Sequence, residues 1–336
     1  EFFVTILFAA AALAIVHDGA KGDTQEELTR LLGKNMSAAE VSSAYSTLTA
    51  SFNTNKSSVI TAVANRFFLD KYTLLKPEYV SHIEKTFNAG AENIDFKKGV
   101  IAARHVNLFV STNTRGMIPS AVTAKDFEGQ HSILVNTVYF KAEWKIPFSE
   151  EDTYSMYFHG ISGKRRVEFM CDRMCTKYVI TDELTAVSLA YKDPAYCMNI
   201  IMPYGSFNDW IDNLNATKLE SVMTQMGEID LKLPKFKIEA DIDGKSALAA
   251  CGIKKIFSSD ADFSAISERS LHVSDVRQKT VIEVTERGTE ASAVTNLYQT
   301  DGCSDEDDPT PKLIFNRPFL YAVLKDDNIL FMGQHV

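Results

Sequence analysis

The sequence predicts an α+β fold, in which helices and strands follow one another without a regular order. Two apolar runs, residues 133–140 and 198–203, are typical of strands that are covered on both faces. Elsewhere apolar residues recur at helical spacing, as at Val80, Ile83 and Phe87. Because no strand–helix–strand unit repeats along the chain, an α+β architecture is favoured over a regular α/β one.

The composition is that of an ordinary globular protein. The chain has 336 residues, of which 45% are apolar and 24% are charged. No linker rich in proline, glycine or serine divides it, and no internal repeat occurs. We therefore expect a single domain over residues 1–336. The net charge of −9 argues against nonspecific binding of nucleic acid.

The first segment, residues 2–16, is almost wholly apolar. It is short for a membrane span and has no basic residues before it, which disfavours a signal peptide or a bilayer helix. A helix that is apolar on all sides belongs in a protein core. We expect a buried helix here.

Local signals mark the helices that follow. Lys76-Pro77 places a proline in the first turn of a helix, where its missing N–H is tolerated. Gly116 is suited to ending the next helix. A later amphipathic helix is predicted by four apolar residues: Trp210, Leu214, Val222 and Met226.

The C-terminal part contains a long connection between two strand-like segments. One strand ends at Glu286 and the next begins near Phe315, whereas connections longer than about 12–15 residues are normally functional or disordered. The first half of this connection alternates small with largely polar residues, as a strand does when one face lies against a core. One face comprises Thr289, Ala291, Ala293, Thr295 and Leu297, and the other Glu290, Ser292, Val294 and Asn296. The sequence thus predicts an exposed loop that is able to become a strand.

Two motifs at this connection resemble the serpins, a family of serine protease inhibitors. Residues 286–295, ERGTEASAVT, resemble the hinge consensus of the family's reactive-centre loop, and residues 315–319, FNRPF, match the motif that follows it. Residues 134–144, LVNTVYFKAEW, resemble a central-strand block, and similar blocks cover nearly the whole chain. The resemblance implies a serpin fold with three β-sheets, about eight or nine helices and an exposed reactive-centre loop over about residues 286–312. It also implies that the chain begins after the first helix of the family.

The resemblance assigns roles to residues around the main sheet. Trp144 takes the family's position at the breach, the top of the sheet where the loop first enters. Thr5, Asn136 and Gln278 take positions at the shutter, where the sheet must open, and their hydroxyl and amides can form a hydrogen-bonded cluster. Phe8 cannot join that cluster, and Gln278 replaces the family's usual histidine. The hinge comprises Glu286, Gly288, Thr289, Glu290, Ala291, Ser292, Ala293, Val294 and Thr295.

The implied activity is suicide inhibition of a protease. The protease attacks the loop and forms an acyl-enzyme through its own serine or cysteine. The cleaved loop then inserts as a new central strand of the main sheet and traps the enzyme. The hinge favours insertion, because its alternate side chains are small and no proline interrupts residues 288–302.

Family spacing from the hinge places the cleaved bond at Gly302–Cys303. Because the loop is longer than usual in the family, the bond lies within a wider window that adds Asp301, Ser304, Asp305, Glu306 and Asp307. No lysine or arginine lies between Arg287 and Lys312, which disfavours a trypsin-like target. The acidic residues indicate either a solvated loop tip or a protease that accepts acidic residues.

Motifs that would indicate other classes of function are absent from the sequence. The sequence contains no HExxH, GxSxG or phosphate-binding glycine motif, and Cys171 and Cys175 lack the second cysteine pair of a zinc site. We therefore expect no enzyme activity, no metal and no cofactor, with a hydrolase as a second alternative. The main alternative is a non-inhibitory serpin with a carrier, chaperone or storage role, which the residues at Phe8 and Gln278 support.

The expected partner is a target protease, bound covalently by a monomeric inhibitor. We expect no membrane or nucleic-acid partner, and no basic cluster indicates a heparin site. Five cysteines without framework-like spacing favour a reducing compartment such as the cytoplasm. Glycosylation sequons, as at Asn35, and the family's usual distribution favour an extracellular one. Both compartments stay open.

Overall fold

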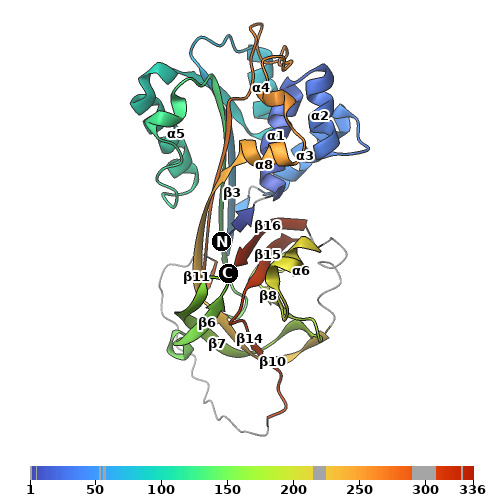
Figure 1. Cartoon of the computed structure of the whole chain (residues 1–336), viewed down its shortest axis with the longest axis vertical. Coiled ribbons are helices and arrows are strands. Elements are labelled where there is room, and N and C mark those ends of the chain that lie inside the picture. Colours follow the sequence, from blue (N-terminus) through green and yellow to red (C-terminus); the bar gives the residue numbers. More distant parts are fainter. Residues whose placement is uncertain are drawn as a thin grey trace.

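A computed structural model describes residues 2–4, 6–52, 54–55, 58–214, 225–289, 308–326 and 328–336. Most helices gather at one end of an elongated molecule, and the other end is rich in strands (Figure 1). The described α-helices are α1 (Ile6–Gly19), α2 (Gly22–Leu32), α3 (Ala38–Phe52), α4 (Pro77–Phe87), α5 (Gly99–Asn113), α6 (Phe207–Asp212) and α8 (Gly244–Ala250). Together with the strands they form the α+β fold that the sequence predicts.

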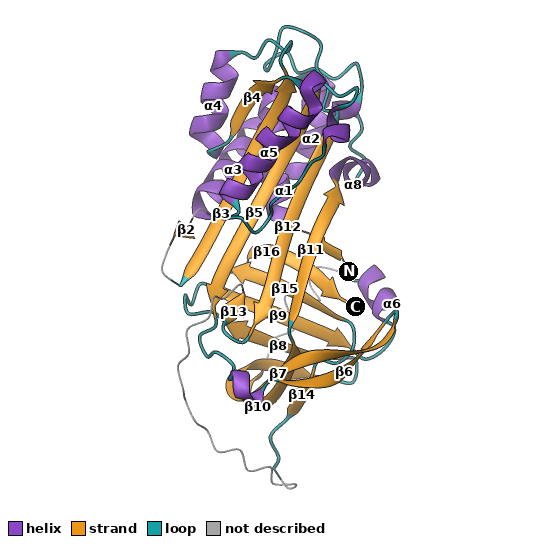
Figure 2. Ribbon diagram, turned by 90° about the vertical axis from the view of Figure 1, so that its left-hand side faces the viewer, coloured by secondary structure: helices purple, strands orange, loops and turns teal. Residues whose placement is uncertain are grey.

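A seven-stranded sheet follows the long axis of the molecule (Figure 2). Its order is β11-β12-β13-β5-β3-β2, with β4 beside β3. Its strands are β2 (Thr54–Asn55), β3 (Val59–Asp70), β4 (Gly90–Ile94), β5 (Ser132–Glu143), β11 (Phe236–Asp243), β12 (Asp275–Thr285) and β13 (Gly288–Thr289). We call the end where β13 lies the hinge end, and the end where β5 and β12 begin the far end.

A nine-stranded sheet packs beside the hinge end. Its strands are β1 (Phe2–Val4), β6 (Tyr154–Gly160), β7 (Gly163–Ile180), β8 (Leu184–Ala190), β9 (Tyr196–Pro203), β10 (Gln225–Pro234), β14 (Lys312–Ile314), β15 (Phe319–Lys325) and β16 (Asn328–His335). The described strands thus join into two hydrogen-bonded sheets where three were expected. The reason is that β7, 18 residues long, pairs with β6 over residues 163–169, with β10 over residues 169–178 and with β8 over residues 177–180.

The two central strands of the seven-stranded sheet are paired over only half their length. From the far end, β5 and β12 are parallel neighbours, from Asp275 beside Ile133 to Thr280 beside Val138. At the hinge end, β13 lies between them and is antiparallel to both. The sheet is therefore closed at its far end and already separated at its hinge end.

Each face of this sheet is covered by a different layer. On one face the far half of the sheet packs against α1, α2, α3 and α4, as Leu134 does. On the same face the hinge half packs against the nine-stranded sheet, through residues such as Phe140 and Ile282. Helix α5 covers the opposite face, where it contacts Ile133 and Val135 (Figure 2). Strand β5 is thus buried on both sides, which explains its continuous apolar sequence, whereas β12 alternates buried and partly exposed residues.

Helix α1 is the buried helix that the sequence predicts. Residues 11–16 are at most 4% exposed. The helix begins at Ile6, and the residues before it form β1, which pairs with β16. None of the described helices is long and apolar enough to span a lipid bilayer.

Two other helix boundaries follow the local signals, and one predicted helix differs from the structure. Helix α4 starts at Pro77, and the side chain of Lys76 before it makes no capping hydrogen bond. Gly116 follows α5 and has a φ of 84°, which favours glycine. Helix α6 ends at Asp212, however, and Met226 lies in β10 with 68% of its surface exposed. The helical spacing of Met226 was coincidental, because short apolar patterns do not distinguish a helix from an adjoining strand.

Candidate functional site

The hinge of the expected reactive-centre loop begins where β12 ends. Glu286 and Arg287 form a turn, after which Gly288 and Thr289 form β13 between β12 and β5. Gly288 has a φ of 150°, and a β-carbon there would lie 2.1 Å from the carbonyl oxygen of Ala142. Only glycine adopts this φ readily and has no β-carbon that would clash with Ala142. Gly288 therefore allows the chain to turn into the sheet at this point.

Glu286 ties the turn to the strands around it. Its carboxylate lies 3.0 Å from Nζ of Lys235 and accepts a hydrogen bond of 2.8 Å from Oγ1 of Thr153. Its carbonyl oxygen accepts from the backbone N–H of Phe148 at 2.8 Å. Burial raises the pKa of Glu286, but a backbone hydrogen bond, Lys235 and Thr153 together hold that pKa below its ordinary value.

This contact predicts a pH-dependent stability. Because the pKa of Glu286 is depressed in the folded state, its contribution is complete above about pH 4.5 and is lost as the pH falls through the folded-state pKa. Glu286→Gln should lower the free energy of unfolding by about 1.5–3 kcal/mol at pH 7, as for hydrogen bonds to charged groups. The difference in melting temperature between the two proteins should shrink between pH 5 and pH 3. A difference that stays constant over that range contradicts the assignment.

Trp144 lies directly beneath the hinge. It is 1% exposed, and its indole Nε1 donates to the carbonyl oxygen of Thr285 at 2.9 Å. Its ring stacks on Tyr191, with ring centroids 4.5 Å apart and an interplanar angle of 11°. The hydroxyl groups of Tyr191 and Thr289 lie 2.7 Å apart. Trp144 and Tyr191 thus form a floor on which β13 rests.

Tyr191 was not identified from the sequence. Its side chain is fully buried, and burial raises its pKa far above the ordinary value. It lies outside every motif used above, next to a turn at the end of β8. A single buried tyrosine carries no periodic signal, so only the fold could place it under Thr289.

Asn136 and Gln278, expected at the shutter, lie side by side in β5 and β12. Nε2 of Gln278 donates to Oδ1 of Asn136 at 2.8 Å, and Nδ2 of Asn136 donates to Oδ1 of Asn65 at 2.6 Å. All three residues are at most 4% exposed. This chain of amides, which we call the amide bridge, links β12, β5 and β3. Thr5 lies outside the described residues, and the sequence analysis did not include Asn65.

Between β13 and the last paired residues of β5 and β12, the described parts of these two strands have no backbone pairing with each other. The paired part of β12 and β5 ends at Thr280 and Val138, and β13 pairs only with residues beyond Glu283. A small cavity lies at this gap, bordered by Val281 and Glu283 of β12, by Tyr139 and Phe140 of β5, and by the residues after α5. On the other face of β12, Oγ1 of Thr280 is buried and has no hydrogen-bond partner among the described residues.

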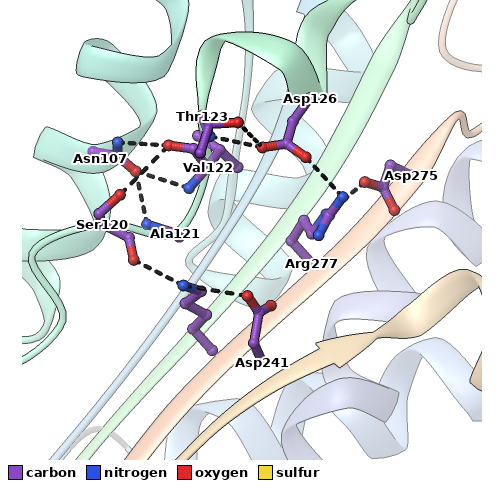
Figure 3. A network of polar contacts seen from close by, with 10 residues as sticks. Asn107, Ser120, Ala121, Val122, Thr123, Asp126, Asp241, Asp275 and Arg277 are labelled. Atoms are coloured by element: carbon purple, nitrogen blue, oxygen red, sulfur yellow. Dashed lines mark hydrogen bonds and ion pairs between the residues drawn. The ribbon is translucent and has the colours of Figure 1, made fainter.

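Residues 119–128, which we call the crossing segment, pass over β12 on the face that α5 covers (Figure 3). Nη2 of Arg277 lies 2.9 Å from Oδ1 of Asp126, and Nζ of Lys279 donates to the carbonyl oxygen of Ser120 at 3.1 Å. Asn107 of α5 holds the same segment through three hydrogen bonds of 2.8–3.0 Å to Ala121 and Val122. The segment is therefore fastened both to α5 and to β12.

We expect Arg277→Gln to loosen the crossing segment. Loss of partly exposed ion pairs with Asp126 and Asp275 should cost about 1 kcal/mol. Amide hydrogen exchange of residues 120–128 should then accelerate about fivefold, the equivalent of that free energy. Arg166→Gln, on the exposed β6–β7 hairpin, is the matched control and should leave these amides unchanged. Equal exchange in the two variants contradicts the fastening role.

The C-terminal end of the loop is held at Asp308. Its carboxylate accepts hydrogen bonds from the backbone and hydroxyl of Thr310 and pairs with Arg173, which also binds Asp230. The hydrogen bonds from Thr310 and Arg173 lower the pKa of Asp308 to about 2. From there β14 pairs with β10 in parallel. Ion pairs thus hold the chain at both ends of the loop.

The middle of the loop lies outside the described residues. This applies to the expected hinge residues Glu290, Ala291, Ser292, Ala293, Val294 and Thr295, and to Asp301, Gly302, Cys303, Ser304, Asp305, Glu306 and Asp307 around the expected cleavage site. Their roles stay predictions. Among the described residues, no group of histidine, cysteine and acidic side chains is arranged to hold a metal ion, and no disulfide bond joins the four described cysteines to one another.

Comparison with known proteins identifies the family. A family model described as serpin (serine protease inhibitor) matches residues 3–336. The chain is 33% identical over 334 residues to a serine protease inhibitor of Rattus norvegicus, across 94% of this chain and 78% of the relative. It is 29% identical over 355 residues to the leukocyte elastase inhibitor of Xenopus tropicalis, across 99% of this chain and 92% of the relative.

The fold agrees with this assignment. A solved structure of thyroxine-binding globulin in complex with thyroxine matches with a TM-score of 0.89, across 99% of this chain and 91% of that chain. At 24% identity this likeness concerns the fold alone. The family model spans both sheets, the hinge and the FNRPF motif, so the chain belongs to the serpin family of protease inhibitors.

Proposed function

We propose that this protein inhibits a protease as a suicide substrate, and that insertion of its cleaved loop into the seven-stranded sheet traps the acyl-enzyme. The observation that carries the proposal is β13. Gly288 and Thr289 already pair with β12 and β5 at once, in antiparallel register with both. Insertion therefore extends an existing strand and does not have to start a new one.

The register of β13 suits the residues that would follow it. Thr289 lies opposite Val284 and Ala142. Continuing this register brings Ala291 between Ile282 and Phe140, and Ala293 between Thr280 and Val138. All these neighbours are at most 3% exposed, so a large side chain would overpack the core at about 1–3 kcal/mol per site. The small side chains of the hinge avoid that cost.

The same register brings Thr295 between Gln278 and Asn136, which now hydrogen-bond each other. Insertion past Ala293 must therefore break the amide bridge. Leaving buried amides without partners costs about 1–3 kcal/mol each, but the hydroxyl of Thr295 can supply one replacement bond. We infer that the amide bridge keeps the sheet closed until cleavage frees the loop.

The proposed target is a serine or cysteine protease that is not trypsin-like. Its attack would fall at Gly302–Cys303 or within residues 301–307, where the acidic side chains are concentrated. The proposed complex is covalent, the inhibitor is monomeric, and no heparin site is needed. Residues 1–336 act as one domain in this proposal. Cell fractionation would distinguish an extracellular from a cytoplasmic site of action.

The decisive experiment is incubation with a panel of proteases of different primary specificity. We expect an SDS-stable complex with at least one enzyme that does not cleave after lysine or arginine. Mass spectrometry of the released C-terminal peptide should then place its first residue within 302–308. Cleavage by every enzyme without any stable complex would contradict inhibition.

A carrier role is the second candidate. The structural neighbour that binds thyroxine motivates it, as does Gln278 at the expected shutter. A carrier that cannot insert its loop should keep nearly the same melting temperature after the loop is cut. We expect instead a large rise in melting temperature, because a new central strand gains hydrogen bonds on both sides at about 0.5–1.5 kcal/mol each.

A further inference from the structure

A cavity of about 890 Å³ lies at the far end of the seven-stranded sheet, away from the hinge. We call it the base cavity. Ser259 and four segments border it: residues 70–73 after β3, residues 96–100 at the start of α5, residues 124–131 at the end of the crossing segment, and residues 269–272 before β12. The volume is within the range of pockets that hold small organic ligands, about 300–1,000 Å³.

The inner wall of the base cavity is apolar and rigid. Phe96, Phe127 and Leu271 are at most 5% exposed, and the two phenylalanine rings pack edge to face with centroids 5.0 Å apart. Tyr72 lines the same space but is 54% exposed. Tyr72 thus offers the accessible aromatic surface of the cavity, and the buried rings of Phe96 and Phe127 lie behind it.

Cationic and imidazole groups line the remaining walls. Nη1 of Arg269 donates to the carbonyl oxygen of Tyr72 at 3.0 Å, the only hydrogen bond of this side chain within the described part of the protein, so other guanidinium N–H groups are available. The rings of His131 and His272 lie edge to face, 5.9 Å apart. Lys97 lies at the rim.

Two acidic groups, Asp70 and Glu128, also line the cavity and balance the formal charges of Lys97 and Arg269, so the preference for a ligand depends on where hydrogen-bond donors are free. The carboxylate of Asp70 already accepts hydrogen bonds from the backbone N–H groups of Tyr72 and Phe96, at 3.1 and 3.3 Å. Glu128 is exposed at the outer side. The donors that remain free therefore favour an anionic ligand group.

The base cavity also spans the junction between the two central strands. Oγ of Ser132, the first residue of β5, donates to the carbonyl oxygen of His272 at 2.8 Å. Oγ of Ser274 accepts from the backbone N–H groups of His131 and Ser132 at 3.1 and 3.3 Å. His131 and His272 thus come from opposite sides of the junction and meet only while β5 and β12 are paired.

We propose that the base cavity binds an amphipathic organic anion, with an aromatic or aliphatic body against Tyr72 and a carboxylate toward Arg269 and the two histidines. A carboxylate at an arginine forms charge-assisted hydrogen bonds, which are about twice as strong as neutral ones. The apolar body adds the affinity of buried surface.

Such a ligand binds the closed sheet, because its walls separate when the central strands part. Binding to one state stabilises that state. The ligand therefore slows insertion of the loop, and insertion expels the ligand. This second step rests on the proposed function, whereas the binding site itself does not.

The test uses 1-naphthaleneacetate and its uncharged amide, 1-naphthaleneacetamide, in isothermal titration calorimetry with the full chain. We expect the acid to bind at least tenfold more tightly than the amide. Arg269→Gln should weaken binding of the acid about tenfold and leave the amide unchanged. Lys177→Gln, which removes one exposed positive charge from β7 in the other sheet, should change neither. Equal binding of acid and amide, or no effect of Arg269→Gln, overturns the proposal.

A second variant tests the cavity without relying on the charge. Ser270 lines the cavity and is exposed, so Ser270→Trp can fill it without disturbing the core. Binding of both compounds should then be lost; retained binding would place them elsewhere and overturn the assignment. With a protease that the protein inhibits, saturating acid should lower the rate constant of complex formation in the wild type but not in Ser270→Trp. If the acid binds but the rate constant does not fall, the proposed coupling between ligand binding and loop insertion is wrong, whereas the binding site is still supported.

Discussion

Thr289→Arg is expected to convert the protein from an inhibitor into a substrate. Thr289 is fully buried between Val284 and Ala142, with its hydroxyl 2.7 Å from that of Tyr191. An unpaired charge buried in the core costs several kcal/mol, so an arginine there should expel β13 from the closed sheet, and insertion of the cleaved loop must then bury that charge. Insertion then becomes slower than deacylation, and the protease releases a cleaved loop. Because 1.4 kcal/mol is a factor of ten, the ratio of cleaved to complexed protein should rise about tenfold or more.

The control for this variant is Glu290→Arg. Continued by one residue, the register of β13 brings position 290 opposite Glu283 and Lys141, which are both partly exposed on the other face of the sheet. Arginine should be tolerated there, and complex formation should stay near the wild-type level. Ala291→Arg, back on the buried face, should behave like Thr289→Arg. An SDS-stable complex formed at wild-type efficiency by either buried-face variant would falsify insertion in this register.

Trp144→Ala should give the largest loss of stability among the variants considered. Removing a fully buried aromatic side chain typically costs about 3–5 kcal/mol. Here the change removes both the stacking on Tyr191 and the hydrogen bond to Thr285. Denaturant unfolding should show this loss, and hydrogen exchange should show faster opening of Gly288 and Thr289, because the floor beneath β13 is gone.

Trp144→Phe separates the two contributions. A phenyl ring can still stack on Tyr191 but cannot donate to the carbonyl oxygen of Thr285. We expect a loss of about 1–3 kcal/mol, the usual cost of an unpaired buried group. If Trp144→Ala is destabilised by less than this variant, the stacking does not support the hinge.

Much of the fold could be predicted from local patterns. The continuous apolar segment before Val16 predicted the buried helix α1, and the run after Ile133 predicted a strand covered on both faces. The resemblance placed Gly288 in the hinge, and its φ of 150° is one that glycine adopts readily. These predictions succeed because periodicity and glycine preferences act over a few neighbouring residues.

The rest depended on contacts between residues far apart in the chain. Lys235 and Thr153 hold Glu286, Tyr191 supports Thr289, and Asn65 completes the amide bridge. None of these residues carries a pattern that indicates its partner. Met226 shows the opposite case, because its helical spacing suggested α-helix while pairing with β7 made it part of a strand.

The hinge shows what the sequence alone indicates and what only the tertiary structure decides. Alternating small side chains from Thr289 to Thr295 make the loop chemically fit for a buried strand, and this is visible in the chain alone because a strand's faces alternate residue by residue. Whether a place exists for that strand depends on how two distant segments meet. The structure shows β5 and β12 parted by β13 at one end and held by the amide bridge at the other. That arrangement arises from packing of whole layers, which no local pattern of residues encodes.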